Sequence, residues 1–503
     1  MNINAAKEDI KNTIKIYLKK DEFGDYRIPV VRQRPIFLLG APGIGKTAIM
    51  EQIAAELKIA LVSYSMTHHT RQSALGLPFI KEKSYGDMKY DVSEYTMSEI
   101  IASIYETMEQ SGVKEGILFL DEINCVSETL APSMLQFLQY KVFGKHAVPE
   151  GWVIVTAGNP PMYNKSVREF DVVTLDRLKV IEVEADYETW KQYALDRNMN
   201  PAITSFLEIK KEFFYHMETT AKGRSYVTAR GWEDLSEIIT LYEEEGLTVD
   251  ESVVDQYLRN DTVIKEFCAY YDLYQKYKHD YKVDEILAGH ISELAVEKAK
   301  KASFDERLSL VGMLLDKVQT EIKEVICTSD YLTELMTPLR ALKGAAAGND
   351  KNIADILKLQ IEGREKLAEN MAKANALTKQ DKLKNKRIIR FLNETYKELL
   401  VSGKTMGEAA FAVVKERFDR QVVDMKQQVS VLSGRLHYMF EFAWTSFGEG
   451  NEMLILVTEL TAGKYSSRYI GTYGCEDYHK YNKLLMITER QNDMKESIMQ
   501  LEL

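Results

Sequence analysis

The sequence predicts an α/β core with a parallel sheet in its first 200 residues, followed by a mainly helical remainder. One observation is the use of proline. Nine of the ten prolines lie between Pro29 and Pro201, and only Pro338 lies beyond them. Because proline marks turns and is expelled from helix interiors, short elements are expected first and long helices later. The other is a change of apolar pattern near residue 186, from short continuous runs to helical spacing.

Several short apolar runs in the front part are typical of buried strands. They span residues 36–39, 61–64, 117–120, 152–155 and 180–183. A helical pattern at 47–57 separates the first two. Continuous apolar runs that alternate with helices indicate a parallel sheet covered on both faces.

Helical spacing dominates from residue 186 onward. For residues 186–247 the expected core side chains are Trp190, Tyr193, Leu195, Phe206, Leu235 and Ile238. The stretch from Phe411 to Met439 places apolar residues at three- and four-residue steps, which predicts one long helix. A core helix is favoured there over an oligomerisation helix. The segment 344–350, rich in alanine and glycine, predicts a break between helices.

Composition excludes several functional classes. The chain has 503 residues, 45% of them hydrophobic and 28% charged, as in soluble globular proteins. Its formal net charge of −11 argues against a general affinity for nucleic acids, which requires clustered basic residues. Four scattered cysteines form no metal or disulfide pattern. The first 20 residues do not read as a signal peptide, and no apolar run reaches membrane-spanning length. We expect a cytoplasmic protein without a membrane or nucleic-acid partner.

Residues 40–47 satisfy the G-x-x-x-x-G-K-[ST] pattern of a phosphate-binding loop, between a predicted strand and a predicted helix. Glycines let backbone N–H groups approach phosphates, and the helix N-terminus adds positive potential. Lys46 is expected to reach the β- and γ-phosphates, and the Thr47 hydroxyl to ligate Mg²⁺. The expected nucleotide-binding residues are Gly40, Ala41, Pro42, Gly43, Ile44, Gly45, Lys46 and Thr47.

Two acids follow the apolar run 117–120 at the carboxyl edge of the predicted sheet. Asp121 is expected to hold the Mg²⁺ shell with Thr47 and to complete the cofactor site. Glu122 is expected to polarise the attacking water. Asn159 ends the run that begins at Trp152 and is suited to orient that water, although an Asn-Pro turn would also explain it. Together these residues predict a P-loop nucleoside triphosphatase with ATP and Mg²⁺.

In this order, the motifs resemble those of the AAA+ ATPases, and within them the MoxR-like branch. The resemblance covers roughly residues 30–250. It rests on GAPGIGKT (40–47), LFLDEINCVSETLAPSMLQFLQ (118–139), AGNPPMYNKSVREFDVVTLDRL (157–178) and TARGWEDLS (228–236). It implies an AAA+ αβ core at 30–185 and a helical lid at 186–250. The helical patterns outside this range predict an N-terminal helix at 1–29 and an α-helical extension at 251–503, and that extension departs from the compact pattern of the branch.

The resemblance also implies roles for single residues. Asn159 corresponds to sensor 1. Arg177 corresponds to the arginine finger that enters a neighbouring subunit's site, with Arg168 as the alternative. Arg230 corresponds to sensor 2, with Arg224 as the alternative. Arginine suits these roles because its charge is permanent and its planar fork matches phosphate oxygens.

Two insertions fit the same branch. Residues 66–110 are longer than one helix requires and resemble an insert that faces the ring pore; His68 and His69 in it have no third ligand at a suitable spacing. Residues 141–149 predict a hairpin before the strand that ends at Asn159. In the extension, the basic residues between Lys382 and Arg390 are interpreted as a solvated helix face.

We therefore expect an ATPase that assembles into a homo-oligomeric ring, a hexamer, and remodels, activates or loads a protein partner in a chaperone-like manner. By family analogy that partner carries a von Willebrand A-type domain. ATP rather than GTP also follows from the family, because the loop contacts only phosphates. The alternatives are a nucleotide-gated scaffold with incidental hydrolysis and a nucleic-acid-associated nucleoside triphosphatase.

Overall fold

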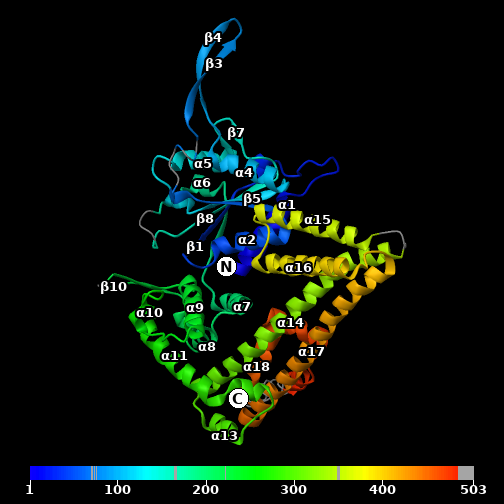
Figure 1. The fold of residues 1–503 in the computed structure, drawn as a ribbon. Helices are drawn as coiled ribbons and strands as arrows, with labels where there is room; N and C mark the ends of the chain where they lie inside the picture. The colour runs from blue at the N-terminus through cyan, green and yellow to red at the C-terminus, as the bar shows by residue number, and fades with distance from the viewer. Residues whose placement is uncertain are drawn as a thin grey trace, which may run out of the picture. The chain divides into compact units, whose positions relative to one another are not determined.

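The structure is a computed structural model, drawn in Figure 1. It describes residues 1–503 except 69–71, 73, 75, 164–166, 221–222, 348–351 and 485–503. Contacts group the chain into two units. Unit 1 comprises residues 1–189 and 358–393, and unit 2 comprises residues 190–357 and 394–503. The segment 358–393, which lies within the expected helical extension, thus packs with the front of the chain.

A five-stranded parallel sheet forms the centre of unit 1, in the order β2-β5-β8-β1-β9. The strands are β1 (Ile36–Gly40), β2 (Ala60–Ser65), β5 (Gly116–Asp121), β8 (Trp152–Gly158) and β9 (Lys179–Val183). Each corresponds to one of the apolar runs, so the predicted parallel sheet is confirmed. All seven residues of β8 are buried, because this strand lies in the middle of the sheet.

Helices cover both faces of the sheet, as predicted (Figure 1). On one face, α4 (Glu99–Ser111) and α5 (Ala131–Tyr140) bury apolar side chains against Phe37, Val62 and Leu118. On the other face lie α1 (Ile3–Tyr17) and α2 (Lys46–Leu57).

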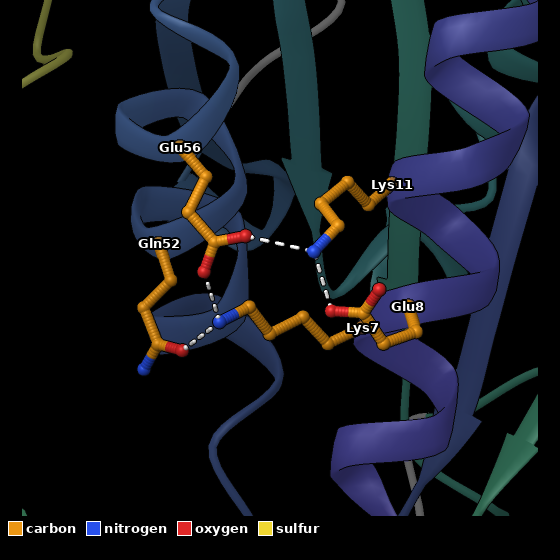
Figure 2. Close-up of polar contacts among 5 residues, drawn as sticks. All are labelled: Lys7, Glu8, Lys11, Gln52 and Glu56. Atoms are coloured by element: carbon orange, nitrogen blue, oxygen red, sulfur yellow. Dashed lines mark hydrogen bonds and ion pairs between the residues drawn. The ribbon is translucent and has the colours of Figure 1, made fainter. Parts of the chain in front are cut away.

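The N-terminal helix α1 is fixed on α2 by apolar burial and by a small polar network (Figure 2). Ile10 and Ile14 of α1 are completely buried. Lys7 Nζ donates to Gln52 Oε1 at 2.9 Å and to Glu56 Oε1 at 2.6 Å, and Lys11 Nζ donates to Glu56 Oε2 at 2.9 Å. Burial alone would raise the pKa of Glu56, but hydrogen bonds from the two lysines outweigh it and hold that pKa below its ordinary value.

Both predicted insertions contain hairpins. Within residues 66–110, the strands β3 (Pro78–Tyr85) and β4 (Met88–Tyr95) pair antiparallel and project from the sheet core (Figure 1). His68 lies in the short helix η2, and His69 lies outside the described residues. The hairpin expected at 141–149 is confirmed by β6 (Val142–Phe143) and β7 (His146–Ala147).

Unit 2 is mainly helical. Its long helices α14 (Phe304–Ala346) and α17 (Gly407–Phe447) pack along each other with α18 (Asn451–Ala462) and α19 (Lys464–Tyr473). Leu432, Leu436 and Met439 of α17 are buried, which confirms a core helix. α14 ends at Ala346 and α15 begins at Ile353, so the predicted break at 344–350 is confirmed.

The region 186–247 departs in part from the helical prediction. A hairpin of β10 (His216–Thr220) and β11 (Gly223–Val227) interrupts its helices. The two strands pair along their whole length, from His216 opposite Val227 to Thr220 opposite Gly223, and this pairing outweighs the helical spacing of the flanking segments. Trp190, Phe206 and Leu235 are buried as expected, whereas Tyr193, Leu195 and Ile238 are half-buried.

The described residues contain further α-helices. They are α6 (Val172–Leu175), α7 (Tyr187–Arg197), α8 (Pro201–Ile209), α9 (Ala229–Glu244), α10 (Glu251–Asp255), α11 (Asp261–Tyr281), α12 (Val283–Leu287), α13 (Glu293–Lys301), α15 (Ile353–Lys373) and α16 (Lys379–Ser402).

Candidate active site

Three adjacent strands bring the predicted site residues to one edge of the sheet. β8 lies between β1 and β5, and all three run in parallel. Their carboxyl ends therefore meet at the crevice where parallel α/β sheets bind ligands. β1 leads into the loop that begins at Gly40, β5 ends at Asp121 and β8 leads to Asn159.

The loop between β1 and α2 has the backbone that its glycines predict. Gly43 has φ 76° and Gly45 has φ 94°, left-handed conformations that favour glycine. At Gly40, a Cβ atom would lie 2.7 Å from the carbonyl oxygen of Val183. The predicted loop thus forms a turn that ends at the N-terminus of α2. Its residues are Gly40, Ala41, Pro42, Gly43, Ile44, Gly45, Lys46 and Thr47.

Lys46 is nearly buried, with 8% of its surface exposed. Its ammonium group donates to the carbonyl oxygens of Gly40 at 2.9 Å and Ala41 at 2.8 Å, and to Asn159 Oδ1 at 2.9 Å. The last bond joins the phosphate-binding loop to the end of β8. Because an ammonium has only three protons, a phosphate that binds Lys46 must replace one or more of these acceptors.

Thr47 and Asp121 lie side by side, with 2.9 Å between Thr47 Oγ1 and Asp121 Oδ2. Asp121 Oδ1 also accepts from the backbone N–H of Glu122 at 2.9 Å. A hydroxyl and a carboxylate are hard oxygen ligands, which Mg²⁺ prefers, and this ion usually takes its other ligands from water and substrate phosphate. These two side chains therefore fit the predicted role in holding Mg²⁺.

Glu122 adopts a left-handed backbone, with φ 55°, and its carboxylate is engaged by two hydroxyl groups. Glu122 Oε2 accepts from Ser65 Oγ at 3.1 Å and from Thr67 Oγ1 at 3.0 Å. Ser65 ends β2, which pairs with β5 in the sheet, and Thr67 lies in the helix η2 that follows. Sequence reasoning missed both hydroxyl residues. The signal that the sequence offers is that both residues follow the apolar run 61–64, which was itself predicted to be a strand of the sheet.

Asn124 is a second residue that sequence reasoning missed. It is 4% exposed, and its Nδ2 donates to the backbone oxygen of Asn159 at 2.8 Å. A Cβ atom on Gly158 would lie 2.5 Å from Asn124 Oδ1, so glycine leaves the space that the amide fills. The backbone oxygen of Asn124 accepts from Arg168 N at 2.9 Å. Asn124 thus links the loop after β5 to the end of β8.

The two candidate arginine fingers differ in their surroundings. Arg177 follows α6, and its Nη1 donates to Gln139 Oε1 of α5 at 2.7 Å. Arg168 forms an ion pair with Glu128. Both side chains are largely exposed. Their roles across a subunit boundary stay predictions.

Arg230 is an exposed residue in the first turn of α9 in unit 2. The Thr228 side chain caps this helix by accepting from the backbone N–H of Gly231 at 3.1 Å. The alternative to Arg230, Arg224, lies in β11. The sensor 2 role of either arginine stays a prediction.

Comparison with known proteins accords with this geometry. Residues 36–173 match the model of the ATPase family associated with various cellular activities (AAA). This stretch is an AAA ATPase domain. The AAA domain begins with β1, includes Lys46, Asp121, Glu122 and Asn159, and ends within α6 before Arg177. No curated protein sequence matches the chain. Among the described residues, no helix is both long and apolar enough to cross a membrane.

Proposed function

We propose that this protein is a MoxR-type AAA+ ATPase that hydrolyses ATP in an oligomeric ring to remodel a protein partner. One observation carries the proposal. Two hydrogen bonds, Lys46–Asn159 and Thr47–Asp121, connect the phosphate-binding loop to the ends of β8 and β5. Phosphate-binding, metal-binding and water-orienting groups thus converge at one sheet edge, as phosphoryl transfer requires.

Each side chain then has a distinct role. Lys46 exchanges its loop carbonyl partners for phosphate oxygens. Thr47 and Asp121 would hold Mg²⁺, which when bound would supply positive charge beside the phosphate oxygens. Glu122 accepts a proton from the attacking water, and the Asn159 amide fixes the direction of that water.

The ring and the partner belong to the same proposal. Arg177 is exposed just beyond the AAA domain, where a neighbouring subunit can receive it. We propose a hexamer in which Arg177 completes the adjacent site and Arg230 contacts the γ-phosphate of its own subunit. The proposed partner is a protein, and family analogy suggests one that carries a von Willebrand A-type domain.

Turnover by three variants tests the proposal. Glu122→Gln removes the base but keeps size, so ATP should bind with near-wild-type affinity while turnover falls by roughly 100-fold or more. Arg177→Ala should show a similar loss, and it should depend on assembly, because an arginine finger contributes about 10³-fold or more. Arg168→Ala is the matched control and should retain most activity. If the wild type and all three variants bind ATP with equally negligible turnover, the ATPase proposal fails.

The second candidate is a nucleotide-gated scaffold, and the engaged Glu122 carboxylate favours it. A base that remains held by Ser65 and Thr67 would give ATP binding without turnover. Equal, negligible turnover in the wild type and Glu122→Gln would support this reading. A nucleic-acid-associated function is disfavoured by the net charge of −11. Salt-dependent binding of DNA would support a nucleic-acid-associated function.

A further inference from the structure

The side chain of Arg177 is held by a neutral partner in its own subunit. Its Nη1 atom donates to Oε1 of Gln139 at 2.7 Å, although the two residues are 38 positions apart in the sequence. Gln139 is half-buried in the last turn of α5, and Arg177 is exposed. Because an arginine carries only donors, the amide oxygen of Gln139 is the atom that must face it.

The backbone on the arginine side of this bond is fixed by α6 and by the burial of the next residue. The Asp171 carboxylate caps α6 by accepting from the N–H of Thr174 at 2.7 Å. The N–H of Arg177 donates to the oxygen of Thr174 at 3.1 Å. Leu178 is 4% exposed and belongs to the same hydrophobic cluster as Leu138 of α5. Arg177 is therefore an exposed side chain on an anchored backbone.

The backbone on the glutamine side is fixed by that cluster too. Phe137 and Leu138 of α5 are buried, and the Phe137 ring stacks on Phe143 of β6 with 3.9 Å between ring centroids. Lys141 closes the helix with a left-handed φ of 57°, and its N–H donates to the oxygen of Phe137 at 2.6 Å. Gln139 lies between these anchors. Both ends of the bond thus rest on one core.

The charge of Arg177 is left uncompensated by this partner. Within the described part of the chain, Arg177 forms no ion pair, whereas Arg168 does. The pKa of Asp171 lies below its ordinary value, mainly because of hydrogen bonds from Thr174 and less because of the charge of Arg177. A carboxylate partner would compete with phosphate for the guanidinium. The Gln139 amide orients the guanidinium without neutralising it.

A single bond also leaves the guanidinium able to bind phosphate. Arginine has five N–H donors in a planar fork, and the bond at Nη1 uses one of them. A free arginine side chain samples many rotamers, and a ligand that binds it must restrict them. A partner in the same subunit restricts these rotamers beforehand, which is the general benefit of preorganisation.

We propose that Gln139 is a positioning residue that orients Arg177 toward the γ-phosphate held by a neighbouring copy of this chain. The inference rests on the proposed function, in which Arg177 completes the adjacent site. Gln139 acts only through Arg177, so its loss slows hydrolysis in the neighbouring subunit. The site of its own subunit, with Lys46 and Glu122, stays intact.

Mixed assemblies of full-length subunits test this action in trans. An Arg177→Ala subunit has a complete site but no finger, and a Glu122→Gln subunit has the finger but no base. Mixing the two should restore turnover at the Arg177→Ala sites. Gln139→Met keeps the length and the helix propensity of the side chain and removes the acceptor. Gln136→Met is the matched control, because Gln136 is exposed and lies one turn earlier on α5.

The inference predicts an asymmetric result. Gln139→Met in the Glu122→Gln subunit should lower the restored kcat roughly tenfold, since a misplacement of about 1 Å has effects up to a hundredfold. The same change in the Arg177→Ala subunit should have no effect, because no finger is present there to position. Gln136→Met should have no effect in either subunit. Equal losses in both subunits, no loss, or a higher kcat with the Gln139→Met donor would overturn the inference.

A second readout needs no hydrolysis. A non-hydrolysable ATP analogue with Mg²⁺ should strengthen subunit association through the contact between Arg177 and the γ-phosphate, as measured by analytical ultracentrifugation. Gln139→Met should weaken this analogue-dependent association roughly fivefold, and Arg177→Ala should weaken it more. The double variant should match Arg177→Ala alone, because Gln139 acts through Arg177.

The two readouts separate the inference from the proposed function. If association responds in this way but the wild type hydrolyses no ATP, the ATPase function fails and the inference stands. If the wild type hydrolyses ATP and Gln139→Met changes neither readout, the inference fails and the ATPase function stands. If mixing restores no turnover and association ignores the analogue, Arg177 is not the finger, and the inference is wrong with it.

Discussion

At the scale of residues, the site contains two kinds of side chain. Some belong to a local sequence motif, and others reach the site only because the sheet places their strands side by side. Lys46, Thr47 and Asp121 could be predicted because their spacing from glycines and strands is fixed along the chain. The roles of Ser65 and Asn124 could not be predicted, because a serine or an asparagine after a strand is common in loops that have no catalytic role. Their partners, Glu122 and Asn159, come from neighbouring strands of the sheet.

Asn124 offers a test at this scale. Asn124→Asp keeps the shape but removes the N–H donor that holds the Asn159 backbone, so Asn159 loses its fixed direction. We expect kcat to fall roughly tenfold or more while ATP affinity changes little, since positioning contributes mainly in the transition state. Steady-state kinetics and a nucleotide-binding assay measure the two quantities.

The paired change is Gly158→Ala, whose added methyl group must displace the Asn124 amide. It should show the same split between kcat and affinity. A fall in affinity and kcat together would instead indicate general unfolding of the site, and an unchanged kcat would rule out a positioning role for Asn124.

At the scale of elements, continuous apolar runs identified all five sheet strands, because strands of a parallel sheet are buried on both faces and are therefore apolar without interruption. The hairpin of β10 and β11 escaped prediction, since its pairing depends on contacts across a turn. The same limit applies to the α15–α16 hairpin, whose helices were expected but whose contact with β2 joins residues about 300 positions apart.

The packing of α1 on α2 allows the contribution of apolar burial to stability to be compared with that of exposed ion pairs. Ile10→Ala leaves a cavity at a fully buried position and should destabilise unit 1 by about 2–4 kcal/mol. Glu56→Gln removes ion pairs at a position that is 42% exposed and should cost less than about 1 kcal/mol. Chemical denaturation, followed by hydrogen exchange in α1, measures both effects.

The effect of Glu56 should also depend on pH. The pKa of Glu56 is lowered from 4.5 in the folded state, so its contribution is present above pH 4.5 and disappears as the pH falls through the folded pKa. The difference between wild type and Glu56→Gln should therefore vanish in acid. Equal destabilisation by Ile10→Ala and Glu56→Gln at neutral pH would show that the polar network, and not apolar burial, anchors α1.

At the scale of the whole molecule, the two units interleave in sequence, because unit 1 takes residues 358–393 from the second half. A chain in which a flexible linker replaces residues 358–393 keeps both parts of unit 2 but lacks Ala374 and Asn375, which bond to Leu61 of β2. We expect it to associate through the β2 edge and to lose protection at the Leu61 amide, since exposed edge strands pair with other chains. Size-exclusion chromatography and hydrogen exchange test this. A monomeric variant with wild-type protection of Leu61 would contradict it.

The interleaving has a consequence for biosynthesis. The ribosome releases β2 long before it makes Ala374, and at 5–20 residues per second the delay is roughly 15–60 s. Once β9 has emerged, the nascent sheet has every strand of its core, and one edge stays unprotected until Ala374 is made. The AAA domain is therefore completed late in translation, after the long helix α14 has been made. Until then, chaperones or neighbouring nascent chains can reach β2.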